Sequence, residues 1–220
     1  YAVHAASSSP VPVEEASASM LSRKWKKTPC TPTAFHISRT ALVSVRALQE
    51  GNANFVTGKA LPRPASDIWD AEPLAIIATS IEIRVATQRL FDMPPGKLST
   101  HRFMGDIPGD RGSSQFTSLE RAVAHIASPP ILLVLARTFD MAIRRPCSGM
   151  SDKTCMSSEL SVLASMEDII LNSPVIRRAM EGGMELHGGI FNHLTGAVDF
   201  VGPHPLVQEL VDLGRQRQTS

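Results

Sequence analysis

Two apolar runs, each followed at once by small and charged residues, constrain the fold of this chain more than any other feature. They are LAIIATSIEIR at residues 74–84 and PPILLVLARTFDMAI at residues 129–143. A continuous apolar run that ends in polar residues is typical of a buried parallel strand leading into a loop. In open α/β sheets, binding and chemistry take place outside the carboxyl ends of such strands. We therefore expect any functional residues where these two strands end.

The remaining patterns alternate helix with strand, which favours the α/β class. Ser38 is a suitable N-cap for the first helix, Gly51 is expected to end or bend it, and Pro174 is suited to the first position of a later helix. We expect the following helices and strands: helices at 38–55, 85–91, 115–127, 159–171 and 206–213, with a further one beginning at Pro174; strands at 74–79, 98–103, 131–135, 184–191 and 197–201.

Composition excludes several classes of function. The net charge of +1 gives no electrostatic basis for binding nucleic acid or an anionic membrane surface. No run approaches the roughly 20 apolar residues of a membrane span. The three cysteines, Cys30, Cys147 and Cys155, follow no metal-ligand spacing, and idle thiols are the simpler interpretation.

From about residue 41 to residue 206 the chain resembles a β-class carbonic anhydrase. The segments that carry the resemblance are LQEGNANFVTGKALPRP at 48–64, SDIWDAEPLAIIATS at 66–80, HRFMGDIPGDRGSSQFTSLERAVAHIA at 101–127, ILLVLARTFDMAI at 131–143 and SPVIRRAMEGGMELHGGIFNHLTGAVDFVGPHP at 173–205. The resemblance implies a mainly parallel central sheet flanked by helices over residues 38–220. It also implies a dimer, homo- or heteromeric, because in that family an N-terminal helix reaches over a partner subunit.

The same resemblance locates a degenerate metal site. The family binds catalytic zinc through a Cys-x-Asp-x-Arg motif after the first strand and a His-x-x-Cys motif after a later one. Here the first motif is Ser80-Ile81-Glu82-Ile83-Arg84 and the second is Arg137-Thr138-Phe139-Asp140. Arg84 is retained, Glu82 is a lengthened form of the aspartate, and the ligand positions hold Ser80, Arg137 and Asp140.

These replacements remove the chemistry that zinc requires. Catalytic zinc needs three good nitrogen, sulfur or carboxylate ligands and an open fourth position for the water that it activates. A serine hydroxyl is a poor ligand, and Arg137 is a permanent cation where a dication would stand. We therefore predict no metal, no cofactor and no catalytic residue. A hard-cation site on Glu82 and Asp140 is a remote alternative.

Bulky apolar residues stand near the degenerate site, and we expect them to close the pocket that carbon dioxide would enter. They are Phe103, Met104, Phe139 and Met141. The four formal charges at the site cancel, which leaves two interpretations open. Either an ion-pair cluster replaces the metal as a local staple, or the charged residues have drifted to solvent, where ion pairs contribute little. The charges belong to Glu82, Arg84, Arg137 and Asp140.

Residues 1–37 differ in kind from the rest and are predicted to form an extended low-complexity arm. They are rich in small and polar residues and carry a basic patch at residues 23–27. The chain opens at Tyr1, which favours removal of a presequence in an organelle, a plastid before a mitochondrion. We expect the arm to dock onto protein partners, with a solvated basic run as the alternative.

The sequence supports three classes of function. The first is a catalytically inactive carbonic-anhydrase-like scaffold in a larger complex, such as a photosystem. The second is an active carbonic anhydrase that works through a non-standard site or an intact partner in a heterodimer. The third is a module in which Arg84 and Arg137 bind bicarbonate or another small anion. The completeness of the ligand loss favours the first.

Overall fold

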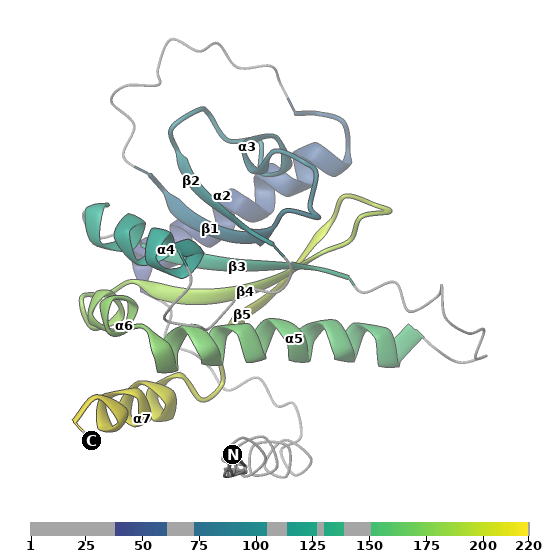
Figure 1. The fold of residues 1–220 in the computed structure, drawn as a ribbon. Helices are drawn as coiled ribbons and strands as arrows, with labels where there is room; N and C mark the ends of the chain where they lie inside the picture. Colours follow the sequence, from purple (N-terminus) through teal and green to yellow (C-terminus); the bar gives the residue numbers. More distant parts are fainter. Residues whose placement is uncertain (1–37, 61–72, 105–113, 127–129, 139–150, 220) are drawn as a thin grey trace, which may run out of the picture. The chain divides into compact units, whose positions relative to one another are not determined.

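The computed structural model describes residues 38–60, 73–104, 114–126, 130–138 and 151–219 (Figure 1). The predicted arm at 1–37 lies outside these ranges. So do the segments at 61–72, 105–113, 127–129 and 139–150, which include Asp140, Phe139 and Met141.

A five-stranded sheet organises the described residues. Its order is β2-β1-β3-β4-β5, with the first four strands parallel and β5 antiparallel to β4. This arrangement confirms the predicted α/β class with a mainly parallel sheet. The strands are β1 (Ala75–Ser80), β2 (Leu98–Phe103), β3 (Ile131–Arg137), β4 (Glu185–Phe191) and β5 (Val198–Pro203).

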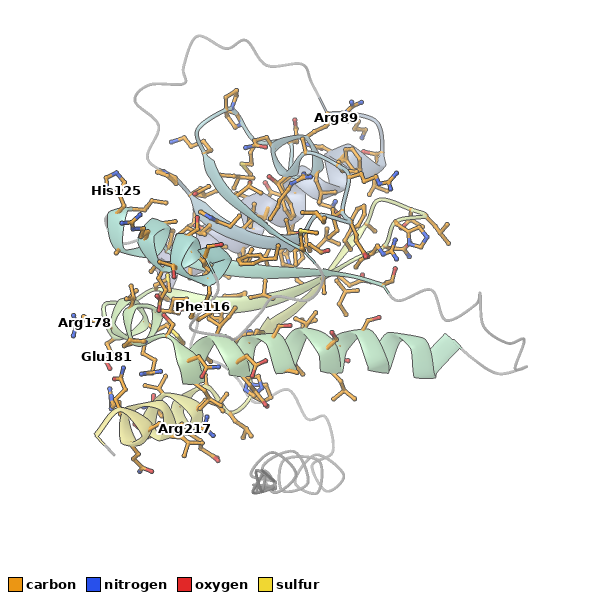
Figure 2. The ribbon with its side chains drawn as sticks, in the orientation of Figure 1. Arg89, Phe116, His125, Arg178, Glu181 and Arg217 are labelled. Atoms are coloured by element: carbon orange, nitrogen blue, oxygen red, sulfur yellow. The ribbon has the colours of Figure 1, made fainter. Side chains whose placement is uncertain are left out.

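Helices cover both faces of the sheet, with α2 and α3 on one face and α4, α5 and α6 on the other (Figure 1). Beyond α5, the last helix, α7, packs mainly against α5. Their bounds are α2 (Arg39–Val56), α3 (Thr87–Leu90), α4 (Ser114–His125), α5 (Ser151–Asn172), α6 (Pro174–Glu181) and α7 (Val207–Thr219). Polar and charged side chains such as those of Arg89, His125, Arg178 and Arg217 lie at the outer surface, whereas Phe116 of α4 is fully buried (Figure 2).

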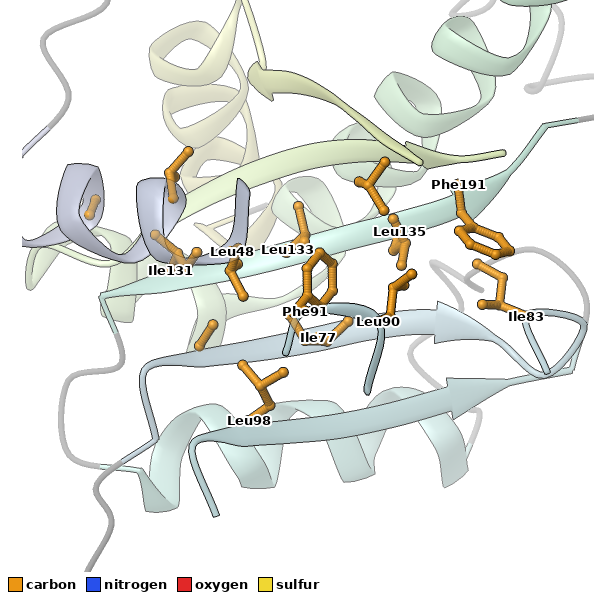
Figure 3. Close-up of a cluster of buried hydrophobic side chains, with 14 residues drawn as sticks. Leu48, Ile77, Ile83, Leu90, Phe91, Leu98, Ile131, Leu133, Leu135 and Phe191 are labelled. Carbon is orange, nitrogen blue, oxygen red and sulfur yellow. The ribbon is translucent and has the colours of Figure 1, made fainter. Parts of the chain in front are cut away.

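The two central strands are buried on both faces, which explains their continuous apolar sequences. Every residue of β1 from Ala75 to Thr79, and of β3 from Ile131 to Leu135, is fully buried. On the face of α2, Leu48 packs with the side chains of Ile77 and Leu133 in one apolar cluster (Figure 3). Burial on both sides leaves no room for polar alternation along these strands.

The start of α2 is fixed by a carboxylate from the sheet. Ser38 is the N-cap, as predicted, and its hydroxyl accepts the backbone N–H of Ala41 (3.2 Å). No acidic residue stands in the first turn. Instead Glu185 of β4 accepts the Ser38 N–H (2.6 Å), and its other oxygen contacts Nε2 of His187 (2.9 Å). A negative charge here stabilises the positive end of the helix dipole.

Gly51 does not end the first helix, because α2 continues through it to Val56, in agreement with the predicted span of 38–55. The backbone of Phe91 passes so close that a Cβ at position 51 would lie 1.7 Å from its carbonyl oxygen. The glycine therefore serves a close approach between α2 and the end of α3, not a turn.

Asn52 follows at once and joins three segments. Its Nδ2 donates to the carbonyls of Leu90 (3.3 Å) and Gly196 (2.9 Å), and its Oδ1 accepts the N–H of Val198 (2.8 Å). The side chain is almost completely buried. It thus fixes α2 to the end of α3 and to the turn between β4 and β5.

Two predicted helix bounds need correction near the end of the chain. Helix α5 begins at Ser151, eight residues before the predicted start at 159, and Leu160 on this helix is 45% exposed. Helix α7 extends to Thr219, beyond the predicted end at 213. Within the described part of the chain, we find no helix with the length and apolarity needed to cross a bilayer.

Candidate functional site

The candidate site lies where β1 and β3 end, because these neighbouring parallel strands finish at the same edge of the sheet. Thr79 stands beside Leu135 in their register, so Ser80 and Arg137 terminate adjacent strands. The sequence prediction that the two strand ends converge is confirmed.

An ion pair spans the two strand ends. The guanidinium of Arg137 lies 3.5 Å from the carboxylate of Glu82. The two side chains are 38% and 55% exposed. An ion pair this open to water stabilises the fold by less than about 1 kcal/mol. The ion pair matters more for the chemistry of the site than for stability. It places the permanent positive charge of Arg137, paired with Glu82, at the predicted site.

Ser80 is used to shape the loop after β1. Its Oγ accepts the backbone N–H of Glu82 (3.2 Å), and its carbonyl accepts the N–H of Ile83 (3.2 Å). The N–H of Ile81 donates to the carbonyl of Phe103 on β2 (2.8 Å). A hydroxyl that closes a turn in this way is a common local motif of serine. Ser80 thus has a structural role, because its hydroxyl closes the turn of the loop after β1.

The arginine that the resemblance retains stays outside this ion pair. Arg84 is exposed at the surface. The neighbouring guanidinium of Arg102 donates to the carbonyl of Val85 (2.7 Å), which fixes the loop to β2 from the other side. Of the five predicted site residues, the structure joins Glu82 with Arg137 and places Ser80 beside them. Asp140 lies outside the described residues.

A cluster of buried apolar side chains anchors this loop to the core. Ile83 is fully buried and lies beside Phe191, at the end of β4, with Leu90 and Leu135 next to them (Figure 3). Sequence reasoning missed Ile83, because the preceding Ile81 is identical in type and is 44% exposed. The only available signal for the burial of Ile83 was the alternation of exposed and buried residues that can continue past the end of a strand.

The predicted filling of the pocket is partly wrong. Phe103 is buried, as expected, but Met104 is 72% exposed and fills nothing. Phe139 and Met141 lie outside the described residues, so their predicted role stays a prediction.

The described titratable residues provide no obvious metal cage. Within the described ranges, no three His, Cys, Asp or Glu side chains come together in a way that would hold a metal ion. His187 contacts Glu185, and His204 lies 3.2 Å from Glu167, both inside the fold and away from the strand ends. His101 of β2 is half-buried, and this burial lowers the pKa of its imidazole.

Comparison with known proteins gives a structural answer only. No protein-family model and no curated protein sequence matches this chain. Solved structures do match. The β-carbonic anhydrase CafA of the fungus Aspergillus fumigatus superposes with a TM-score of 0.54 at 14% identity, over 81% of this chain and 97% of that one.

A second match extends the same result. The Coccomyxa β-carbonic anhydrase, solved with acetazolamide, gives a TM-score of 0.50 at 16% identity over 86% of each chain. The chain has the β-carbonic anhydrase fold. At this identity the β-carbonic anhydrase structures establish the architecture, and the activity has to be argued from the residues at the strand ends.

Proposed function

We propose that this protein is a non-catalytic member of the β-carbonic anhydrase fold that serves as a structural subunit of a larger assembly. The observation that carries the proposal is the Glu82–Arg137 ion pair at the ends of β1 and β3. A guanidinium cannot lose its proton in a protein, so Arg137 cannot act as a ligand to a metal ion.

Two further contacts support the absence of hydration chemistry. The Ser80 hydroxyl is occupied by the Glu82 N–H, and it is a weak zinc ligand in any case. Ile83 is fully buried against the core, so the loop that carries Ser80 and Glu82 is anchored by an apolar side chain. The loop therefore keeps its shape without a metal.

Without catalysis, the function of the protein would rest on its folded structure as a binding platform. The sheet with its two covered faces is a rigid platform, and the low-complexity residues 1–37 are suited to docking onto a protein partner. We assign the assembly to an organelle, a plastid before a mitochondrion, with a photosystem as the first candidate. These assignments rest on the sequence of residues 1–37.

Co-purification tests the structural role. The full chain, tagged at its C-terminus, is expressed in its natural host, and its native size is measured beside a variant that lacks residues 1–37. A scaffold subunit should migrate in a complex far larger than its own 23.8 kDa, and the truncated variant should leave that complex. Migration at the same small size for both chains would contradict the proposal.

Two rival functions predict other results. An active enzyme in a heterodimer would co-purify with an intact carbonic anhydrase and carry hydration activity. A bicarbonate module would gain thermal stability with added bicarbonate, and Arg84→Ala would abolish that gain. Arg137 is already neutralised by Glu82, which weakens the two-arginine version of this module.

A further inference from the structure

A serine hydroxyl and an imidazole lie together on β2. The Oγ of Ser99 is 3.3 Å from Nε2 of His101. The two residues are two positions apart on one strand, so their side chains point to the same face of the sheet. Among the described residues, Ser99 is the hydrogen-bond partner that the structure gives to His101. The imidazole is therefore directed at the hydroxyl.

The pair lies on the face of the sheet that α4 covers. Leu98 belongs to the apolar cluster on the face of α2, so Ser99 and His101, at the alternate positions, point to the opposite face, where α4 packs (Figure 1). In the register with β1, Ser99 stands beside Ile76 and His101 beside Ala78. Both residues of the pair are half-buried, which shields them partly from water and leaves them within reach of a small molecule.

The surroundings keep the imidazole able to take up a proton. Burial, rather than a charged neighbour, lowers the pKa of His101, so the ring is neutral at pH 7. A neutral imidazole donates at one ring nitrogen and accepts at the other. With the N–H at Nδ1, Nε2 accepts the Ser99 hydroxyl proton. These are the parts of a hydroxyl nucleophile with an adjacent general base.

We propose that Ser99 is a nucleophile activated by His101, and that it accepts acyl groups from small activated esters. A separation of 3.3 Å between the two atoms suits this role, because such contacts are often loose before a substrate binds. The pair is separate from the ends of β1 and β3 and needs no metal. The proposal therefore does not depend on the structural role proposed above.

The reaction is an acyl transfer. The Oγ of Ser99 attacks the carbonyl carbon of the ester and forms a new C–O bond, while Nε2 of His101 takes the hydroxyl proton. The bond between the carbonyl carbon and the leaving oxygen then breaks. The imidazolium returns its proton to the departing oxygen, so the products are O-acyl-Ser99 and an alcohol or phenol.

The missing third group sets the class of substrate. Within the described residues, no carboxylate is hydrogen-bonded to His101, so the pair lacks the residue that orients the imidazole in a Ser-His-Asp triad. Such a pair depends on the substrate for a good leaving group. Phenyl esters provide one, and peptide bonds do not.

A second half-buried serine provides an internal control. The hydroxyl of Ser165 on α5 donates to the carbonyl of Ser161 (3.0 Å), with no base to take its proton. If the bond between Ser99 and His101 were only structural, the two serines should react alike. Reactivity confined to Ser99 would show that the imidazole activates it.

Acetylation by p-nitrophenyl acetate tests the proposal. The full-length protein is treated at pH 7, and peptide mass mapping gives the rates at Ser99 and Ser165 in the same sample. We expect acetylation at Ser99 to be faster by a factor on the order of 10². His101→Gln, checked for folding by circular dichroism, should reduce the rate at Ser99 to that at Ser165. Equal rates at the two serines of the wild type would overturn the proposal, whether or not the variant folds.

The pH dependence of the wild type separates assistance by the imidazole from direct ionisation of the hydroxyl. The rate at Ser99 should follow the neutral fraction of His101 and level off by about pH 7, because the pKa of His101 lies below its ordinary 6.5. A rate at Ser99 that keeps rising to about pH 9 would overturn the role of His101, as would an unchanged rate in a folded His101→Gln variant.

Discussion

Replacing Asn52 with alanine removes the side chain that joins α2, α3 and the β4–β5 turn. Three hydrogen bonds disappear, two to the carbonyls of Leu90 and Gly196 and one from the N–H of Val198. Each contributes about 1 kcal/mol net. The Val198 N–H is left without its acceptor in a buried position, which adds about 1–3 kcal/mol. We expect Asn52→Ala to lower the free energy of unfolding by about 4–6 kcal/mol.

Such a loss is a large part of the roughly 5–15 kcal/mol that stabilises a typical domain. Urea denaturation followed by far-UV circular dichroism measures it by linear extrapolation. Asn54→Ala is the matched control on the same helix. Its Nδ2 makes one partly buried bond to Asp92 (3.1 Å), and its loss should cost about 1 kcal/mol or less. A loss below about 1 kcal/mol for Asn52→Ala, or equal losses for both variants, would refute the reasoning.

Three other predictions concern the helix contact, the ion pair and pH. Gly51→Ala should lower Tm sharply, because its Cβ would lie 1.7 Å from the carbonyl oxygen of Phe91; an unchanged Tm would show that α2 can move away. A double-mutant cycle of Glu82→Ala and Arg137→Ala should give a coupling below about 1 kcal/mol, since both side chains are well exposed, and a value above about 2 kcal/mol would mean a shielded pair. Burial lowers the pKa of His101 from its ordinary 6.5, so the unfolded chain binds the proton first and stability falls as pH drops from about 7 through and below that value. His101→Gln should flatten this dependence in urea denaturation at pH 5 to 8, and identical slopes would contradict the assignment.

Sequence patterns predicted the fold well where burial alone decides the structure. The runs that became β1 and β3 are apolar throughout because helices cover both of their faces, and no other arrangement suits them as well. Gly51 shows the limit. A glycine inside a helix can signal its end, but here it makes room for the backbone of Phe91, 40 residues later in the chain, and no local pattern shows that contact.

The candidate site was predictable in position but not in detail. Strand-end logic brought Ser80, Glu82 and Arg137 to one place, and the structure keeps them together. Sequence could not tell which of Ile81 and Ile83 is buried, because the loop turns between them, where the two Ser80 oxygens accept the N–H groups of Glu82 and Ile83. Met104 was expected to fill the pocket because it is bulky and apolar. The size of a side chain does not show whether it points into the protein or toward solvent once the strand has ended.

Zinc content of the purified chain tests the central claim most directly. The full-length protein is produced in zinc-supplemented medium, desalted and analysed for bound metal, and the same sample is assayed for carbon dioxide hydration by stopped flow. An intact β-carbonic anhydrase prepared in parallel controls for metal loading. With Ser80 closing a turn and Arg137 paired to Glu82, we expect well under 0.1 zinc per chain, on the order of background, and no hydration above the uncatalysed rate. Close to one zinc per chain, with hydration that a chelator abolishes, would contradict the account.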